Sequence, residues 1–117
     1  MKWYLAKLVY QIICGDGTHT PQFDEQLRLV YADDNDDAIH SAIRIGKKEE
    51  QTFINQNKSL VKWQFINIAD LVMLSHFAEG AEVFSIIKEP VNAEVYIEDV
   101  NRKAESLSKA ACNFANT

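Results

Sequence analysis

The sequence predicts an α+β domain in which an antiparallel sheet follows the order β-β-α-β-β-α and the helices pack on the sheet. Three observations predict it. Residues 3–14 and 23–31 alternate in polarity on either side of a glycine-containing loop, which is typical of a β-hairpin. Helical spacing of apolar residues begins after the acidic run 33–37. Two later segments, 60–68 and 83–88, have the composition of strands.

The first strand carries apolar residues on both faces. Its even positions form an unbroken apolar face that we expect the first helix to cover: Tyr4, Ala6, Leu8, Tyr10, Ile12 and Cys14. Its odd positions add a second apolar set, which we expect a neighbouring subunit or the chain's own tail to cover: Trp3, Leu5, Val9 and Ile13. The second strand places Phe23, Leu27, Leu29 and Tyr31 on one face and Asp24, Gln26 and Arg28 on the other.

The acidic run 33–37 reads as the start of a helix. Asp34 or Asn35 can cap its free N–H groups, and apolar residues recur at helical spacing as far as Phe53. We therefore expect the helix to end near residues 55–57. A calcium loop does not fit, because Ala38 stands where the turn needs glycine. Gly46 inside the helix predicts a close approach to the sheet or a kink.

The later elements leave two alternatives open. Residues 71–74 either continue the strand 60–68 past a bulge or form a short strand of their own. A turn at Glu79–Gly80 precedes the strand 83–88, which Pro90 ends. After Pro90 the sequence favours a helix capped by Asn92, with a strand over 94–99 as the competing interpretation.

The bulk composition fits one folded domain. The chain has 117 residues, of which 47% are hydrophobic and 25% charged. We expect an α+β core over residues 1–90, followed by a C-terminal helical extension with a loose tail over residues 91–117. We see no internal repeat.

Charge and cysteine content exclude several classes of partner. The net charge of −5 argues against nucleic-acid binding, which depends on clustered Lys and Arg. No apolar run is long enough for a membrane span, and the first residues do not resemble a secretory signal. Two widely separated cysteines, Cys14 and Cys112, do not make a disulfide framework. These features predict a cytoplasmic protein.

The hairpin loop holds the densest group of polar residues. Asp16, His19 and Glu25 are the candidates for a small-ligand or metal site, and a thiolate–imidazole pair of Cys14 with His19 is conceivable. Against this, the spacing lacks the three or four ligands of a zinc site, and Cys14 lies on the apolar face. The glycines and Asp16 are more typical of a shaped turn. We therefore assign no catalytic residue, no metal and no cofactor.

Four short motifs stand out along the chain: Trp3-Tyr4-Leu5-Ala6-Lys7, Gln26-Leu27-Arg28-Leu29, Trp63-Gln64-Phe65 followed by Ala69-Asp70-Leu71, and Gly80-Ala81-Glu82-Val83 followed by Ser85. With these motifs the chain resembles a family of small uncharacterised bacterial proteins, a domain of unknown function. The resemblance spans residues 1–88. It implies a bacterial, cytoplasmic origin but assigns no catalytic role to any residue.

These observations predict a non-catalytic interaction or assembly module rather than an enzyme. We expect it to form a homo-oligomer through Trp3, Leu5, Val9 and Ile13, the second apolar set of the first strand. The alternative is a small-ligand or metal-dependent activity centred on residues 15–25.

Overall fold

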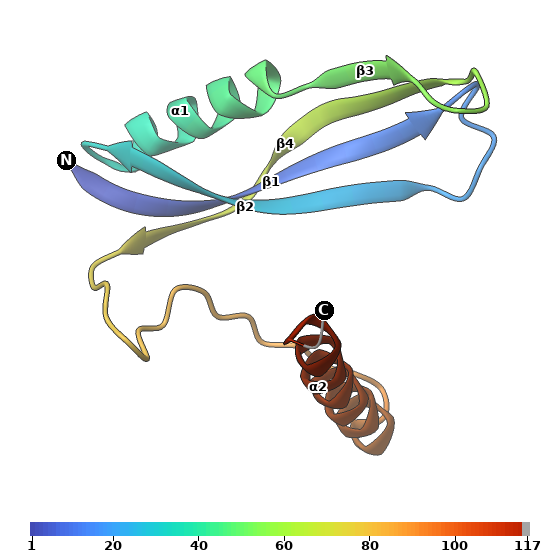
Figure 1. Cartoon of the computed structure of the whole chain (residues 1–117). Helices are drawn as coiled ribbons and strands as arrows, with labels where there is room; N and C mark the ends of the chain where they lie inside the picture. Colours follow the sequence, from blue (N-terminus) through green and yellow to red (C-terminus); the bar gives the residue numbers. More distant parts are fainter. Residues whose placement is uncertain (116–117) are drawn as a thin grey trace. The chain divides into compact units, whose positions relative to one another are not determined.

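The computed structural model describes residues 1–115, with side chains described for residues 1–108. Its elements are β1 (Lys2–Cys14), β2 (Gln22–Ala32), α1 (Asn35–Lys48), β3 (Gln51–Ile54), β4 (Leu60–Leu74) and α2 (Ala93–Ala115). The strands form one antiparallel sheet in the order β2-β1-β4-β3 (Figure 1). The α+β class and the antiparallel sheet are confirmed. Two compact units divide the chain: Met1–Ser85 holds the sheet and α1, and Ile86–Thr117 holds α2.

Strands β1 and β2 form the predicted hairpin. Their register is regular, and it pairs Lys2 with Ala32 at one end and Ile12 with Gln22 at the other. The connecting loop turns at Gly15 and Gly17, whose φ angles are +59° and +83°. Residues that carry a side chain rarely adopt such backbone angles, so glycine at these two positions allows the hairpin to close.

Helix α1 begins as predicted. Asp34 is the N-cap, and its Oδ1 accepts the N–H of Asp37 at 2.9 Å. Figure 1 shows α1 lying along one face of the sheet. Ala38 and Ala42 of α1 join the core, which also contains buried residues of β1 and β2: Tyr4, Ala6, Leu8, Tyr10, Val30 and Ala32. The even face of β1 is therefore the face that α1 covers.

Gly46 brings α1 into close contact with the sheet. A Cβ atom at this position would clash with the ring of Phe65 in β4. The Tyr10 hydroxyl donates a hydrogen bond of 2.8 Å to the Gly46 carbonyl. Of the two interpretations of Gly46, the close approach is the one observed.

The predicted end of this helix, near residues 55–57, is wrong. Helix α1 ends at Lys48, and Phe53 belongs to β3, where it pairs with Val61. A tight turn joins β3 to β4, in which Asn55 Oδ1 accepts the N–H groups of Asn57 and Ser59. This turn folds Phe53 onto β4, so its helical spacing from α1 is coincidental.

Strand β4 runs without interruption to Leu74. Its register with β1 shifts between Lys7 and Leu8 and again between Val9 and Tyr10. The shifts leave Ala69 and Ile66 as the extra residues, one at each bulge. Residues 71–74 therefore continue the strand past a bulge.

The predicted strand over 83–88 is wrong. The turn at Gly80 is present, with φ +85°, but residues 81–92 contain no strand. The fourth strand of the sheet is instead β3. An apolar segment needs an unpaired edge to become a strand, and composition alone does not show whether one is available.

After Pro90 the helical interpretation is correct. Asn92 Oδ1 accepts the N–H of Val95 at 3.1 Å, and α2 follows from Ala93. The helix keeps large apolar side chains exposed, among them Ile97, Val100 and Leu107. That α2 packs on the sheet, and that the core ends at residue 90, stay predictions. Of the predicted loose tail, residues 116–117 lie outside the described residues.

Candidate functional site: the open face of the sheet

The register of the first hairpin gathers apolar side chains on the face opposite α1. It pairs Trp3 with Tyr31 and Leu5 with Leu29, so odd positions of β1 lie beside odd positions of β2. Paired residues of a sheet point to the same side. We call this side the open face: residues 3–13 of β1 and 23–31 of β2 at odd positions.

Strand β2 supplies a row of exposed apolar side chains on the open face. We call Phe23, Leu27, Leu29 and Tyr31 the apolar row; their exposed fractions are 56%, 51%, 53% and 49%. The Trp3 ring extends the row, since its centroid lies 4.6 Å from that of Tyr31. Isolated exposed apolar residues are ordinary, but a contiguous set on one face is typical of an interaction site.

The interface residues expected from β1 differ in exposure. Trp3 is exposed, Val9 and Ile13 are half-buried, and Leu5 is buried. The more exposed part of the face lies on β2. Its alternation is visible in the sequence, but the sequence does not tell which face of β1 it joins.

The polar groups of the open face pair with one another. Lys7 Nζ lies 3.4 Å from a carboxylate oxygen of Glu25 and 5.3 Å from the centroid of the Phe84 ring. Thus the segment after β4 reaches this face at Phe84. The apolar row on β2 remains exposed beside it.

The sheet, α1 and the segment after β4 together coincide with a known domain, because a family model matches residues 3–85. The chain belongs to the DUF4288 family, a domain of unknown function. The resemblance to such a domain is therefore confirmed, and the DUF4288 match ends before α2. Comparisons with curated proteins and with solved structures gave no match.

In the hairpin loop of the DUF4288 domain, the polar side chains form hydrogen bonds with the backbone of the loop and its flanking residues. Asp16 Oδ1 accepts bonds from the N–H and the hydroxyl of Thr18, and these bonds hold the pKa of Asp16 below its ordinary value. His19 Nε2 accepts the N–H of Cys14 at 2.9 Å. Because a backbone N–H can only donate, the ring proton lies on Nδ1, which donates to the Thr20 carbonyl.

The three predicted ligand residues do not converge. Asp16 and His19 lie in the loop, whereas Glu25 pairs with Lys7 on the open face. Among the described residues, no three His, Cys, Asp or Glu side chains are placed to hold a metal ion. Ligand binding by this loop stays a prediction.

A line of hydrogen bonds runs along the other face of β2, a feature that the sequence analysis missed. Arg28 donates to Gln26 Oε1, and Gln26 Nε2 donates to Asp24 Oδ2. The Trp63 indole of β4 also donates to Asp24 Oδ2, at 3.0 Å. The bonds hold the three polar side chains of the edge strand in fixed positions.

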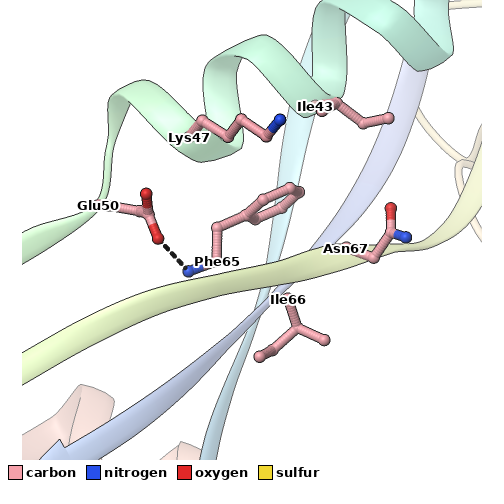
Figure 2. A pocket seen from close by; sticks show the side chains of 6 residues that line it. All are labelled: Ile43, Lys47, Glu50, Phe65, Ile66 and Asn67. Atoms are coloured by element: carbon pink, nitrogen blue, oxygen red, sulfur yellow. Dashed lines mark hydrogen bonds between the residues drawn. The ribbon is translucent and has the colours of Figure 1, made fainter.

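Two hollows border the DUF4288 domain's sheet. One, of about 370 Å³, lies between the end of α1 and β4, where Glu50 accepts the N–H of Phe65 at 2.9 Å (Figure 2). Its walls are Ile43, Lys47, Glu50, Phe65, Ile66 and Asn67. The other, of about 390 Å³, is mostly apolar and includes Trp3, Leu74 and Phe77, beside the open face.

No helix of the described residues is long and apolar enough to cross a membrane.

Proposed function

We propose that this DUF4288 protein is a non-catalytic cytoplasmic interaction module that assembles into a homo-oligomer through the open face of its sheet. One observation carries the proposal: the apolar row keeps about half of each side chain in water, although α1 buries Tyr4, Leu8 and Tyr10 on the opposite face of the sheet. Removing such side chains from water favours association by roughly 25 cal/mol for each Å² buried.

The electrostatics of the open face support a second copy as partner. Lys7 and Glu25 neutralise one another, so the face presents apolar side chains with little net charge. Two identical patches of this kind can face each other without repulsion. The hollow beside Trp3 offers room for an apolar side chain of the partner.

Analytical ultracentrifugation of the full chain over the micromolar range tests the proposal. We expect a dimer or larger species for the wild type and a monomer for Leu29→Glu, because a carboxylate at the centre of the apolar row would be desolvated by association. Ile54→Glu is the matched control: it places the same charge at an exposed position of β3, and we expect it to associate like the wild type.

Circular dichroism of each variant verifies that the fold persists. A wild-type protein that sediments as a monomer at every concentration would overturn the proposal. So would equal loss of association in Leu29→Glu and Ile54→Glu.

A further inference from the structure

We infer that the second copy pairs with the first along β2, in antiparallel orientation about a two-fold axis at Gln26, so that the two sheets become one of twice the width. The inference rests on the proposed self-association and specifies its geometry: the two copies join side by side along β2, so their apolar rows meet at the strand edge instead of stacking on each other.

Strand β2 is an edge strand that lacks the backbone features which usually block pairing, although it carries the charged residues Asp24, Glu25 and Arg28. It lies at one end of the sheet, spans 11 residues, contains no proline and pairs with β1 without a bulge. Exposed edges are normally kept short, bulged or interrupted by proline. The opposite edge, β3, is only 4 residues long. The outer edge of β4 beyond Trp63 is not paired with another strand either, but two bulges interrupt it, so among the described strands β2 offers the longest regular row of free backbone donors and acceptors.

A two-fold axis perpendicular to the sheet restricts the register. It keeps both open faces on the same side, so odd positions of β2 lie opposite odd positions of the partner strand. With the axis at Gln26, Phe23 lies opposite Leu29 of the partner subunit, and Asp24 lies opposite the partner's Arg28. Symmetry repeats each pair, which gives two apolar contacts and two opposite-charge contacts.

The neighbouring registers are less complementary. An axis at Glu25 places that carboxylate opposite the partner's Glu25, and an axis at Arg28 places two guanidinium groups together. An axis at Leu27 sets the Asp24 carboxylate opposite the partner's Val30, so Asp24 meets no cation. The axis at Gln26 also sets one carboxylate, that of Glu25, opposite an apolar side chain, Leu27 of the partner subunit, but Glu25 keeps its ion pair with Lys7. Like charges opposite one another across a sheet are unfavourable, and so is a carboxylate without a charged partner against an apolar side chain.

The Asp24 carboxylate can form an ion pair with the guanidinium of the partner's Arg28. Its Oδ2 accepts from Gln26 and from the Trp63 indole, yet no Lys or Arg of the described residues forms an ion pair with it. The nearest guanidinium on the strand, that of Arg28, donates to Gln26 instead. The partner's Arg28 would supply the missing positive charge.

Cysteine cross-linking of the full chain tests the register. In a Cys14→Ser, Cys112→Ser background, Gln26→Cys lies directly opposite its counterpart, and mild oxidation should convert it to a covalent dimer. Leu29→Cys is the matched control: its counterparts lie six residues apart along the strands, roughly 20 Å, and we expect no covalent dimer.

Charge exchange gives an independent test. Arg28→Asp alone and Asp24→Arg alone each place like charges opposite one another, and both should weaken association in the ultracentrifuge. The double variant Asp24→Arg, Arg28→Asp restores opposite charges across the axis and should recover association, although it also removes the Trp63 bond. Recovery is therefore a result that damage to the fold would not produce.

The outcomes separate the two proposals. A dimer that does not cross-link through Gln26→Cys and does not recover on charge exchange overturns the edge pairing, while self-association through the open face stands. A protein that is monomeric in every form overturns both.

Discussion

The two faces of the sheet are built from the same strands but differ in how far their side chains are buried. On the face under α1, Tyr4, Leu8 and Tyr10 are almost wholly buried. On the open face, Leu27 and Leu29 keep about half of their surface in water. Leu5, on the open face of the central strand β1, is buried as well, so the difference comes both from the edge position of β2 and from what the chain places above each face. An apolar pattern indicates a surface that will be covered, but not what covers it.

The largest expected effect contrasts one leucine from each face. Leu8→Ala removes a fully buried side chain, and we expect it to lower the free energy of unfolding by about 2–5 kcal/mol. Leu29→Ala removes a half-exposed side chain and should change the free energy of unfolding of the monomer by no more than about 0.5 kcal/mol. Urea denaturation, at a concentration where the chain is monomeric, measures both. Equal losses would mean that the open face is already covered within one chain.

A second prediction concerns the close approach of α1. Gly46→Ala forces the Phe65 ring to move, which we expect to destabilise the fold by about 1–3 kcal/mol despite alanine's higher helix propensity. Thermal unfolding measures the loss. Adding Phe65→Leu to this variant makes room for the new methyl group and should recover part of the stability. If Gly46→Ala proves stabilising, the contact is looser than described.

A smaller effect is expected at the hydroxyl that ties β1 to α1. Tyr10→Phe leaves the Gly46 carbonyl without this donor, which we expect to cost about 1 kcal/mol in urea denaturation. Burial raises the pKa of Tyr10 above its ordinary value, 10.0. Above that pH the unfolded chain releases the phenol proton before the folded chain does, so wild-type stability should fall. The difference between wild type and Tyr10→Phe should then narrow, and a constant difference would contradict the assignment.

The smallest effect lies in the hairpin loop, outside both faces. The pKa of Asp16 is lowered in the folded state, so its contribution to stability is present above the ordinary value of 3.8 and is lost as the pH falls through the folded pKa. Asp16→Asn should therefore differ slightly from wild type near neutral pH and converge with it in acid. Urea midpoints over this range measure the difference, which should stay small because the group is fully exposed.

The face that α1 covers could be predicted from the sequence, because the even positions of β1 from Tyr4 to Cys14 are all apolar. Which side chains lie together on the open face could not be predicted from the sequence. It depends on the register of the hairpin, and a slip of one residue would have placed Asp24, Gln26 and Arg28 there instead of the apolar row. That register is set by the conformation of the loop at Gly15 and Gly17, which no periodicity encodes.

The errors in the secondary structure have a similar origin. Phe53 satisfies helical spacing by chance, and only the turn at Asn55 shows that it belongs to a hairpin. Its pairing with Val61 is a tertiary contact, which local propensity does not report. The line of bonds from Arg28 to Trp63 was missed for the same reason, since its last member comes from another strand.

The two bulges of β4 have a consequence for how length changes in this strand would be tolerated. Each adds one residue, so Phe65, Ile68 and Leu71 all pack against the core at intervals of three rather than two. Deleting Ala69 would remove one bulge and leave Asp70 opposite Lys7 and Leu71 opposite Ala6, so every side chain beyond it would keep its face. Deleting Ile66 would straighten the strand at the other bulge in the same way. The two bulges are therefore the places where β4 should tolerate the loss of one residue without changing which side chains lie beneath α1.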